Sequence, residues 1–267
     1  MTPDARPSMP NAVHQSTPVG SPHAAYAELH CLTNFTFLRG ASHPEELVER
    51  ASALGYTALA ITDECSMAGV VKAHIAAKRC QLKLIIGNEL TLEDGTKIIL
   101  LAKNRQGYGE LCHIITLARR RAKKGQYQVT LKDFKGSTEH LIAIWIPQHQ
   151  QRLEPGGLPS ALKTLFGDRL WLGAVRALDG FDHVQTEDLK AIASAHTLPI
   201  VACGDIQMHE SNRKPLLDTL CAIRHGCSVQ SAGRLLQSNA ERYLKTRAEL
   251  TELYPQQWLF NTRNIAE

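Results

Sequence analysis

The sequence predicts an α/β fold organised as a distorted, TIM-like barrel, and three observations support this prediction. Short apolar runs alternate with amphipathic stretches along most of the 267 residues, which is the pattern of βα units. We count about six or seven such units. Several of the apolar runs end on carboxylates or on a histidine, and α/β barrels keep their chemistry at the carboxyl ends of the strands.

Local signals place the elements along the chain. Ser42 stands three residues before Glu45, which is a capping-box start for a helix, and Gly55 fits the position just after its end. The segment Glu93–Gly95 predicts a tight reversal, so a hairpin interrupts the alternation. The expected strands cover 25–30, 56–62, 82–86, 90–92, 97–102, 140–146, 169–174 and 199–203, and the expected helices 44–54, 66–78, a stretch within 104–124, 160–166, 187–196, 213–225 and 246–253.

Composition limits the class of protein. A content of 43% hydrophobic and 21% charged residues is that of an ordinary globular chain. The net charge of +4 gives only slight support for an anionic partner. The seven cysteines form no C-x-x-C pair and are expected to be reduced thiols. No apolar run reaches about 18 residues and no signal peptide is evident, so we expect a cytoplasmic protein that does not enter the membrane.

Four strand-like runs end on side chains that can bind metals or move protons. The run before Asp63 and Glu64 is the most telling, and His30, Glu89 and Asp205 follow similar runs. Because parallel strands share one edge, these groups are expected to converge at one mouth of the barrel. Each also has a structural interpretation, such as a hydrogen-bonded core histidine or a buried ion pair.

A basic cluster ends the amphipathic stretch that lies within residues 104–124. Its cations are favoured at a helix C-terminus by the helix dipole, so a solvated helix end explains them. The alternative is a patch that contacts nucleic-acid phosphates. The candidate nucleic-acid residues are Arg119, Arg120, Arg121, Lys123 and Lys124.

Several segments, in this order, carry a resemblance to a known family. They are ELHCLTNFTFLRG (28–40), ITDECS (61–66), GNEL (87–90), AKNRQGY (102–108) and CGD (203–205). From about Tyr26 to the end, the chain resembles the N-terminal PHP (polymerase and histidinol phosphatase) domain of bacterial C-family DNA polymerases. It is most similar to the error-prone, DnaE-like branch of ImuC type, which acts in damage-induced mutagenesis. The resemblance implies a distorted (β/α)7 barrel of the PHP type.

The resemblance also implies a degenerate metal site. Active PHP enzymes hold several divalent metals with histidines and carboxylates, and His30, Asp63, Glu89 and Asp205 match four of these positions. The metals would generate hydroxide and neutralise a phosphoester. These four residues and Glu64 are therefore the candidate metal ligands.

Four departures weaken that site. Leu32, Glu64 and Gln207 stand where the family has histidines, and Lys97 lies near another histidine position. A leucine cannot bind a metal, and a protonated lysine repels one. We therefore expect at most one weakly bound divalent ion, which could be Mg, Mn or Zn, and Lys97 is expected to pair with Glu89 or Asp205. No residue is assigned a catalytic role.

The leading hypothesis is the PHP module of an error-prone DNA polymerase that performs translesion synthesis, with a mainly structural role for this domain. The expected organisation is a disordered leader over 1–24, a PHP domain over 25–230, and a linker with a truncated start of the polymerase palm over 231–267. The resemblance implies Mg²⁺ for the full-length polymerase, and DNA, dNTPs, a sliding clamp and accessory mutagenesis proteins as partners. The alternatives are a stand-alone metal-dependent phosphoesterase or 3'-5' exonuclease, and a non-catalytic scaffold that binds DNA or protein.

Overall fold

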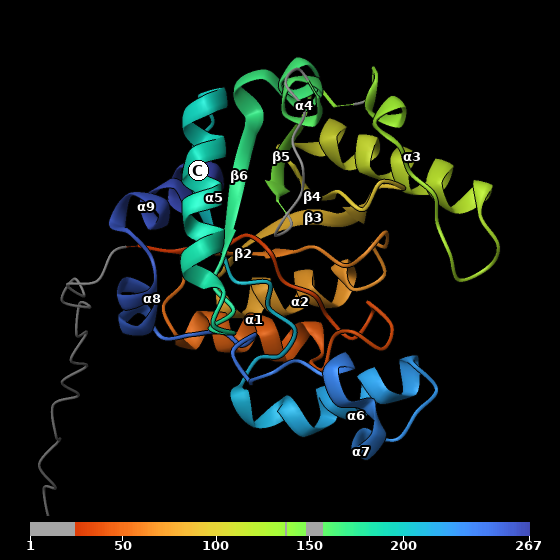
Figure 1. Cartoon of the computed structure of the whole chain (residues 1–267), viewed down its shortest axis with the longest axis vertical. Helices are drawn as coiled ribbons and strands as arrows, with labels where there is room; N and C mark the ends of the chain where they lie inside the picture. Colours follow the sequence, from red (N-terminus) through yellow and green to blue (C-terminus); the bar gives the residue numbers. More distant parts are fainter. Residues whose placement is uncertain (1–24, 137, 148–156) are drawn as a thin grey trace, which may run out of the picture.

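The computed structural model describes residues 25–136, 138–147 and 157–267. The expected leader over 1–24 lies outside the described residues. In the described part, seven strands form one sheet in the sequential order β1 to β7 (Figure 1). Neighbouring strands are parallel except around β4, which is antiparallel to both β3 and β5. The strands are β1 (Ala27–Glu28), β2 (Ala58–Ile61), β3 (Lys83–Thr91), β4 (Lys97–Ala102), β5 (Leu141–Ile146), β6 (Leu170–Val175) and β7 (Ile200–Cys203).

The sheet closes at the carboxyl ends of its first and last strands. Cys31 and Ile206 form a parallel bridge just beyond β1 and β7. The amide of Leu32 donates to the carbonyl of Ile206 at 2.8 Å, and the amide of Ile206 donates to the carbonyl of His30 at 2.9 Å. The expected distorted seven-stranded barrel is therefore confirmed, and its closure draws His30 toward the segment that carries Asp205.

Helix α9 (Gln256–Ala266) fills the opening between the same two strands at their amino ends. The Ala27 amide donates to Thr262 Oγ1 at 3.1 Å, and Asn261 Nδ2 donates to the carbonyl of Ile200 at 2.7 Å. These side chains satisfy backbone groups that unpaired strand edges would otherwise leave without partners. The last turn of α9 packs against the interior core of the barrel through Ala266.

Alternation of side chains along the strands creates two apolar layers. In β2, Leu59 and Ile61 belong to the larger core between the sheet and its helices, whereas Ala58 and Ala60 face the barrel interior. The helices are α1 (Pro44–Ala53), α2 (Val70–Cys80), α3 (Arg105–Arg121), α4 (Leu158–Phe166), α5 (Asp182–His196), α6 (Lys214–Arg224), α7 (Val229–Ala232) and α8 (Arg247–Leu253), with 3-10 helices over Leu131–Phe134, Gly167–Arg169, Ser211–Arg213 and Gly233–Leu235.

Two expected helix starts lie four or five residues from the starts in the structure. The sequence placed the start of the second helix at Ser66, but α2 begins at Val70. Asn88 accounts for the difference, because its amide nitrogen donates to the carbonyl of Ser66 at 3.1 Å and to that of Asp63 at 2.7 Å. The carbonyl of Ser66 is thereby used by a neighbouring strand instead of a helical turn. Helix α5 begins at Asp182, five residues before the expected start.

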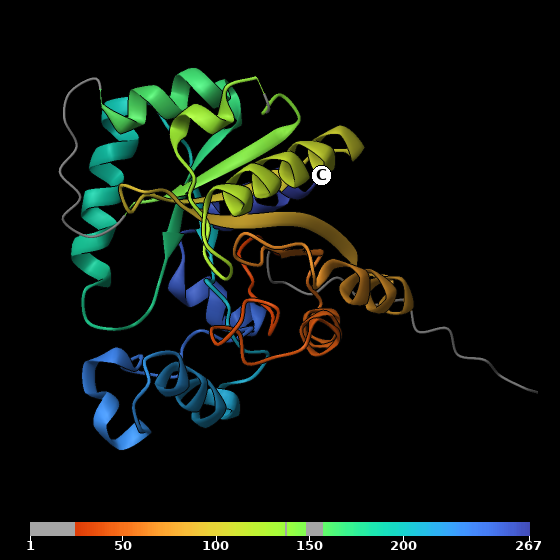
Figure 2. The same ribbon diagram turned by 90° about the vertical axis from the view of Figure 1, so that its right-hand side faces the viewer.

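Helices α6 and α7 project from the lower end of the molecule in both ribbon views (Figures 1 and 2). They are joined to the barrel by a small apolar cluster that includes Leu217 of α6, Met208 and Ala41. The expected domain boundary at residues 230 and 231 stays a prediction. Within the described residues, none of the helices combines the length and the apolar character needed to cross a membrane.

Candidate metal centre and its side-chain cations

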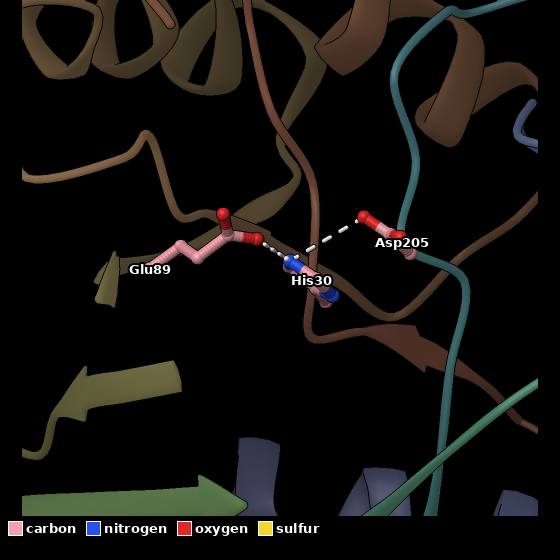
Figure 3. Close-up of side chains that lie close together, drawn as sticks. All are labelled: His30, Glu89 and Asp205. Atoms are coloured by element: carbon pink, nitrogen blue, oxygen red, sulfur yellow. Dashed lines mark hydrogen bonds and ion pairs between the residues drawn. The ribbon is translucent and has the colours of Figure 1, made fainter. Parts of the chain in front are cut away.

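Three predicted residues meet at the carboxyl-end mouth of the barrel. His30 follows β1, Glu89 lies within β3 and Asp205 follows β7 (Figure 3). His30 Nε2 lies 2.7 Å from Glu89 Oε2 and 3.6 Å from Asp205 Oδ1. One ligand atom from each residue falls within 4.8 Å of the others, so the three groups could hold a metal ion. All three side chains are buried.

The hydrogen bond between His30 and Glu89 determines which nitrogen of the imidazole carries the proton. Burial lowers the pKa of His30 and outweighs the opposing effect of Glu89, so the ring is neutral near pH 7. An ionised carboxylate only accepts, and therefore Nε2 of His30 carries the proton. Its Nδ1 is buried and has no hydrogen-bond partner among the described residues. A metal bound through Nε2 would require the proton to move to Nδ1.

Positively charged side chains already form ion pairs with the two carboxylates of this trio, those of Glu89 and Asp205. Arg39 Nη1 lies 2.6 Å from Glu89 Oε1, and Lys97 Nζ lies 3.4 Å from Glu89 Oε2. The guanidinium of Arg242 contacts the carboxylate of Asp205. Burial raises the pKa of Glu89, but Lys97, the hydrogen bond from His30 and Arg39 outweigh it and hold that pKa well below its usual range. Glu89 is therefore ionised at neutral pH without a metal.

Asp63 lies outside the trio and binds a loop instead. Its carboxylate accepts from the Thr33 amide at 2.8 Å, from Thr33 Oγ1 at 2.9 Å and from Thr36 Oγ1 at 2.7 Å. Burial raises its pKa, whereas these hydrogen bonds lower it. Asp63 therefore anchors the loop that follows β1.

Glu64 binds the other end of the same loop. Its carboxylate contacts the guanidinium of Arg39 and accepts from the hydroxyl of Tyr127 at 2.8 Å. A parallel bridge between Glu64 and Glu89 places the two carboxylates on either side of Arg39. The predicted ligand set thus divides into a trio and two loop anchors.

Left-handed backbone conformations surround the site. Leu38, Cys65 and Asp205 have φ values of 60°, 45° and 46°. Such conformations cost about 1 kcal/mol or more in a non-glycine residue and persist where neighbouring contacts hold them. Arg119 supplies part of that support, because Nε and Nη2 both donate to the carbonyl of Cys65, at 3.2 and 3.1 Å.

The positions that depart from the family pattern offer few metal donors. Leu32 is buried in the core and has no donor atom. Gln207 Oε1 accepts from Gln237 Nε2 at 2.7 Å, so this amide is engaged elsewhere. Lys97 lies in the site as a cation. Among the described residues, His30, Glu89 and Asp205 are the one group of side chains close enough together to hold an ion.

The basic cluster at the end of α3 divides into two groups. Arg119 is half-buried, donates to backbone carbonyls and lies over the ring of Tyr127 at 5.3 Å. Arg121 pairs with Asp133 at 2.7 Å. The remaining candidates, Arg120, Lys123 and Lys124, are exposed and have no recorded ion pair within the described part of the chain.

Sequence reasoning missed the residues that bind the carboxylates. Arg39, Arg242, Thr33, Thr36 and Tyr127 all contact a predicted site residue. One signal could have found the two arginines: four carboxylates in an apolar barrel mouth need compensating cations. Lys97 was predicted as an ion-pair partner, and the structure places it beside Glu89.

Comparison with known proteins identifies the family. Residues 28–157 match the model of the PHP domain. An error-prone DNA polymerase from Methylococcus capsulatus is 47% identical over 248 residues, and one from Pseudomonas aeruginosa is 46% identical over 245 residues. These matches cover 92% and 91% of this chain but only 23% of each relative.

A solved structure gives a weaker match. It is an amidohydrolase from Chromobacterium violaceum with 14% sequence identity and a TM-score of 0.49, and the alignment covers 69% of this chain and 88% of that one. The family assignment therefore rests on the sequence relatives and the PHP match. The chain is a PHP-domain protein homologous to the N-terminal part of error-prone DNA polymerases.

Proposed function

We propose that this chain is the PHP module of an error-prone DNA polymerase that acts in damage-induced mutagenesis and translesion synthesis. Its barrel mouth has a structural role in this proposal. One observation carries the structural part: Arg39, Lys97 and Arg242 bind the carboxylates that would otherwise hold metals. The similarity to error-prone polymerases supports the rest.

The three cations replace the electrostatic role of metal ions. Glu89 is fully buried, and an isolated carboxylate there would cost several kcal/mol. Arg39 and Lys97 offset that cost from two sides, and His30 adds a hydrogen bond. Arg39 also contacts Glu64, so the same guanidinium ties the loop after β1 to the end of β2. The site therefore fastens three segments of the barrel mouth together.

In this proposal the polymerase chemistry belongs to the longer protein. No residue of the 267 is assigned to nucleotide addition, which would use Mg²⁺ bound elsewhere in the polymerase. The partners would be primer-template DNA, dNTPs, a sliding clamp and accessory mutagenesis proteins. The PHP module would contribute stability to that assembly.

A second candidate function is a single-ion phosphoesterase or 3'-5' exonuclease, and the trio of His30, Glu89 and Asp205 favours it. A divalent ion there would activate water and polarise a phosphoester. For the ion to bind, His30 would have to present a free nitrogen, and the guanidinium of Arg242 would have to leave Asp205. These requirements make one weakly bound ion the most that the site would take.

A third candidate, a scaffold that binds nucleic acid, rests on the exposed cations Arg120, Lys123 and Lys124. Contacts from these residues to phosphates would weaken steeply as salt rises. This function is compatible with the polymerase proposal, because both would place DNA near the domain.

The intact mass of the native product, measured in the source cells after DNA damage, tests the proposed function. We expect a product several times longer than this chain that extends a primer across a lesion. A native product that ends at Glu267 would refute the polymerase proposal. A phosphodiesterase activity in that product would then favour the second candidate.

A further inference from the structure

A groove opens at the amino-end face of the barrel, opposite the candidate metal centre. Its volume is about 610 Å³, and its walls come from the start of β3, the end of β4, the start of α3 and the end of α9. Ile85 and Leu101 line this groove and also belong to the interior core of the barrel. The groove is therefore continuous with the hydrophobic core.

Apolar groups line much of the groove. Leu84, Ile86, Ile142 and Ile265 are half-buried side chains on its walls. Tyr108 stands at the first turns of α3 and is 39% exposed. An opening into the core of this size leaves apolar surface in contact with water, and such surfaces on proteins commonly mark binding sites.

The rim of the groove is basic. Lys83, Lys103 and Arg105 are exposed on it, and Glu267 is the single carboxylate among the described residues that line it. Lys83 Nζ lies 3.3 Å from the backbone oxygen of Glu267. Neither Lys103 nor Arg105 has a recorded ion pair within the described residues. An occupant that offers apolar side chains flanked by carboxylates would complement both the walls and the rim.

The end of α9 forms part of the wall of this groove. Asn264, Ile265, Ala266 and Glu267 all line it, together with Arg105 and Tyr108 of α3. The related polymerases continue beyond the matched segment, which is their N-terminal 23%. In a protein of that length, the residues that follow α9 would begin in the groove. The effective concentration of these residues at the groove would be high, because they would be attached directly beside it and no linker would be needed to reach it.

We infer that this groove is the docking site for the segment that follows residue 267 in the longer polypeptide, and that the segment is apolar with acidic flanks. The inference rests on the proposed function and deepens it by naming the surface through which the PHP module meets the rest of the polymerase. Docking there would cover the exposed edge of the barrel core, and the rim cations would orient the segment.

Cysteine labelling tests the inference. Lys103→Cys places a thiol on the rim, and maleimide labelling at this site is read by peptide mass spectrometry in the 267-residue chain and in the longer native polypeptide. We expect labelling to be roughly tenfold slower or more in the longer polypeptide, because a covered thiol reacts only when the segment opens. Lys124→Cys, on the exposed segment just after α3, is the matched control and should label equally fast in both.

A double charge reversal on the rim tests whether the docked segment has acidic flanks. Lys103→Glu with Arg105→Glu, in the longer polypeptide, should accelerate proteolytic cleavage just after residue 267. Lys123→Glu with Lys124→Glu makes the same change in charge beyond the other end of α3 and should leave cleavage unchanged. Equal labelling of residue 103 in the two polypeptides would overturn the inference.

The two proposals can fail separately. A longer polypeptide that does not extend primers but still protects residue 103 would refute the polymerase function and leave the docking surface standing. A polymerase whose residue 103 labels as fast as in the 267-residue chain would refute the docking surface alone.

Discussion

Replacing Arg39 by methionine tests the idea that side-chain cations hold the barrel mouth together. Arg39→Met keeps much of the aliphatic stem and removes the guanidinium that binds Glu64 and Glu89. Glu89 would retain Lys97 and His30 as partners, but among the described residues the carboxylate of Glu64 would keep only the hydroxyl of Tyr127. The variant should therefore be folded but less stable.

The size of the effect follows from burial. Breaking a buried ion pair by removing one partner costs about 3–5 kcal/mol. The side chain of Arg39 is 15% exposed and Glu89 keeps a second cation, so we expect the lower end, about 3 kcal/mol. With an m value of about 3 kcal/mol/M in urea, the midpoint of unfolding should fall by about 1 M.

The pH dependence of this loss provides a second test. The folded-state pKa of Glu89 is depressed, so its contribution to stability is complete above the unfolded-state pKa, about 4.3, and is lost as pH falls through the folded-state value. The difference between wild type and Arg39→Met should therefore be full at pH 7 and shrink in acid.

Urea unfolding followed by circular dichroism at several pH values measures both quantities. Arg79→Met is the matched control, because Arg79 forms an exposed pair with Glu49 and its loss should leave the free energy of unfolding almost unchanged. An Arg39→Met protein as stable as wild type at pH 7 would refute the structural role assigned to the cations.

Three further predictions concern the neighbouring groups. Asp63→Ala should lower the melting temperature because three donors on Thr33 and Thr36 lose their acceptor; a phosphodiesterase rate abolished by this change would favour the hydrolytic alternative. Burial raises the pKa of Glu28, so the contribution of this carboxyl to stability should fall as pH rises through the window between its unfolded and folded pKa values. The stability of wild type relative to Glu28→Gln, compared by urea unfolding at pH 5 and 8, should therefore be lower at pH 8. Lys124→Glu should weaken DNA binding and reduce its salt dependence in a fluorescence titration; unchanged binding would exclude a phosphate contact there.

The alternation of apolar runs was sufficient to predict the barrel, and the structure brings three of the predicted site residues together. His30, Glu89 and Asp205 each lie at or beyond an apolar run, and strand ends on one face of a barrel must be neighbours. The antiparallel hairpin of β3 and β4 followed from Glu93–Gly95. The resemblance to the family supported the same conclusions independently.

The partners of the carboxylates could not be predicted in the same way. Arg242 lies far along the chain from Asp205, in an irregular segment whose path no periodicity defines. Arg39 reaches Glu89 only because the loop after β1 folds back, with Leu38 in a left-handed conformation. The position of α9 between β1 and β7 depends on Asn261 and Thr262, which resemble ordinary polar helix residues in the sequence.

The division between the metal trio and the loop anchors was also beyond sequence reasoning. Asp63 and Glu64 follow the same strand as neighbours, yet neither belongs to the trio. Thr33 and Thr36 bind Asp63 through hydroxyls, and threonines in a loop carry no signal for such contacts. Side-chain contacts between loops decide this division, and they depend on the closed barrel.

The metal content of the purified protein tests the central claim most directly. Elemental analysis after gel filtration, with and without prior exposure to Mn²⁺ or Zn²⁺, gives the number of ions bound per chain. Because Arg39, Lys97 and Arg242 already bind the carboxylates, we expect at most one ion per chain, removed by brief dialysis against a chelator. Two or three tightly retained ions per chain would contradict the account and restore a metal-dependent phosphoesterase as the leading function.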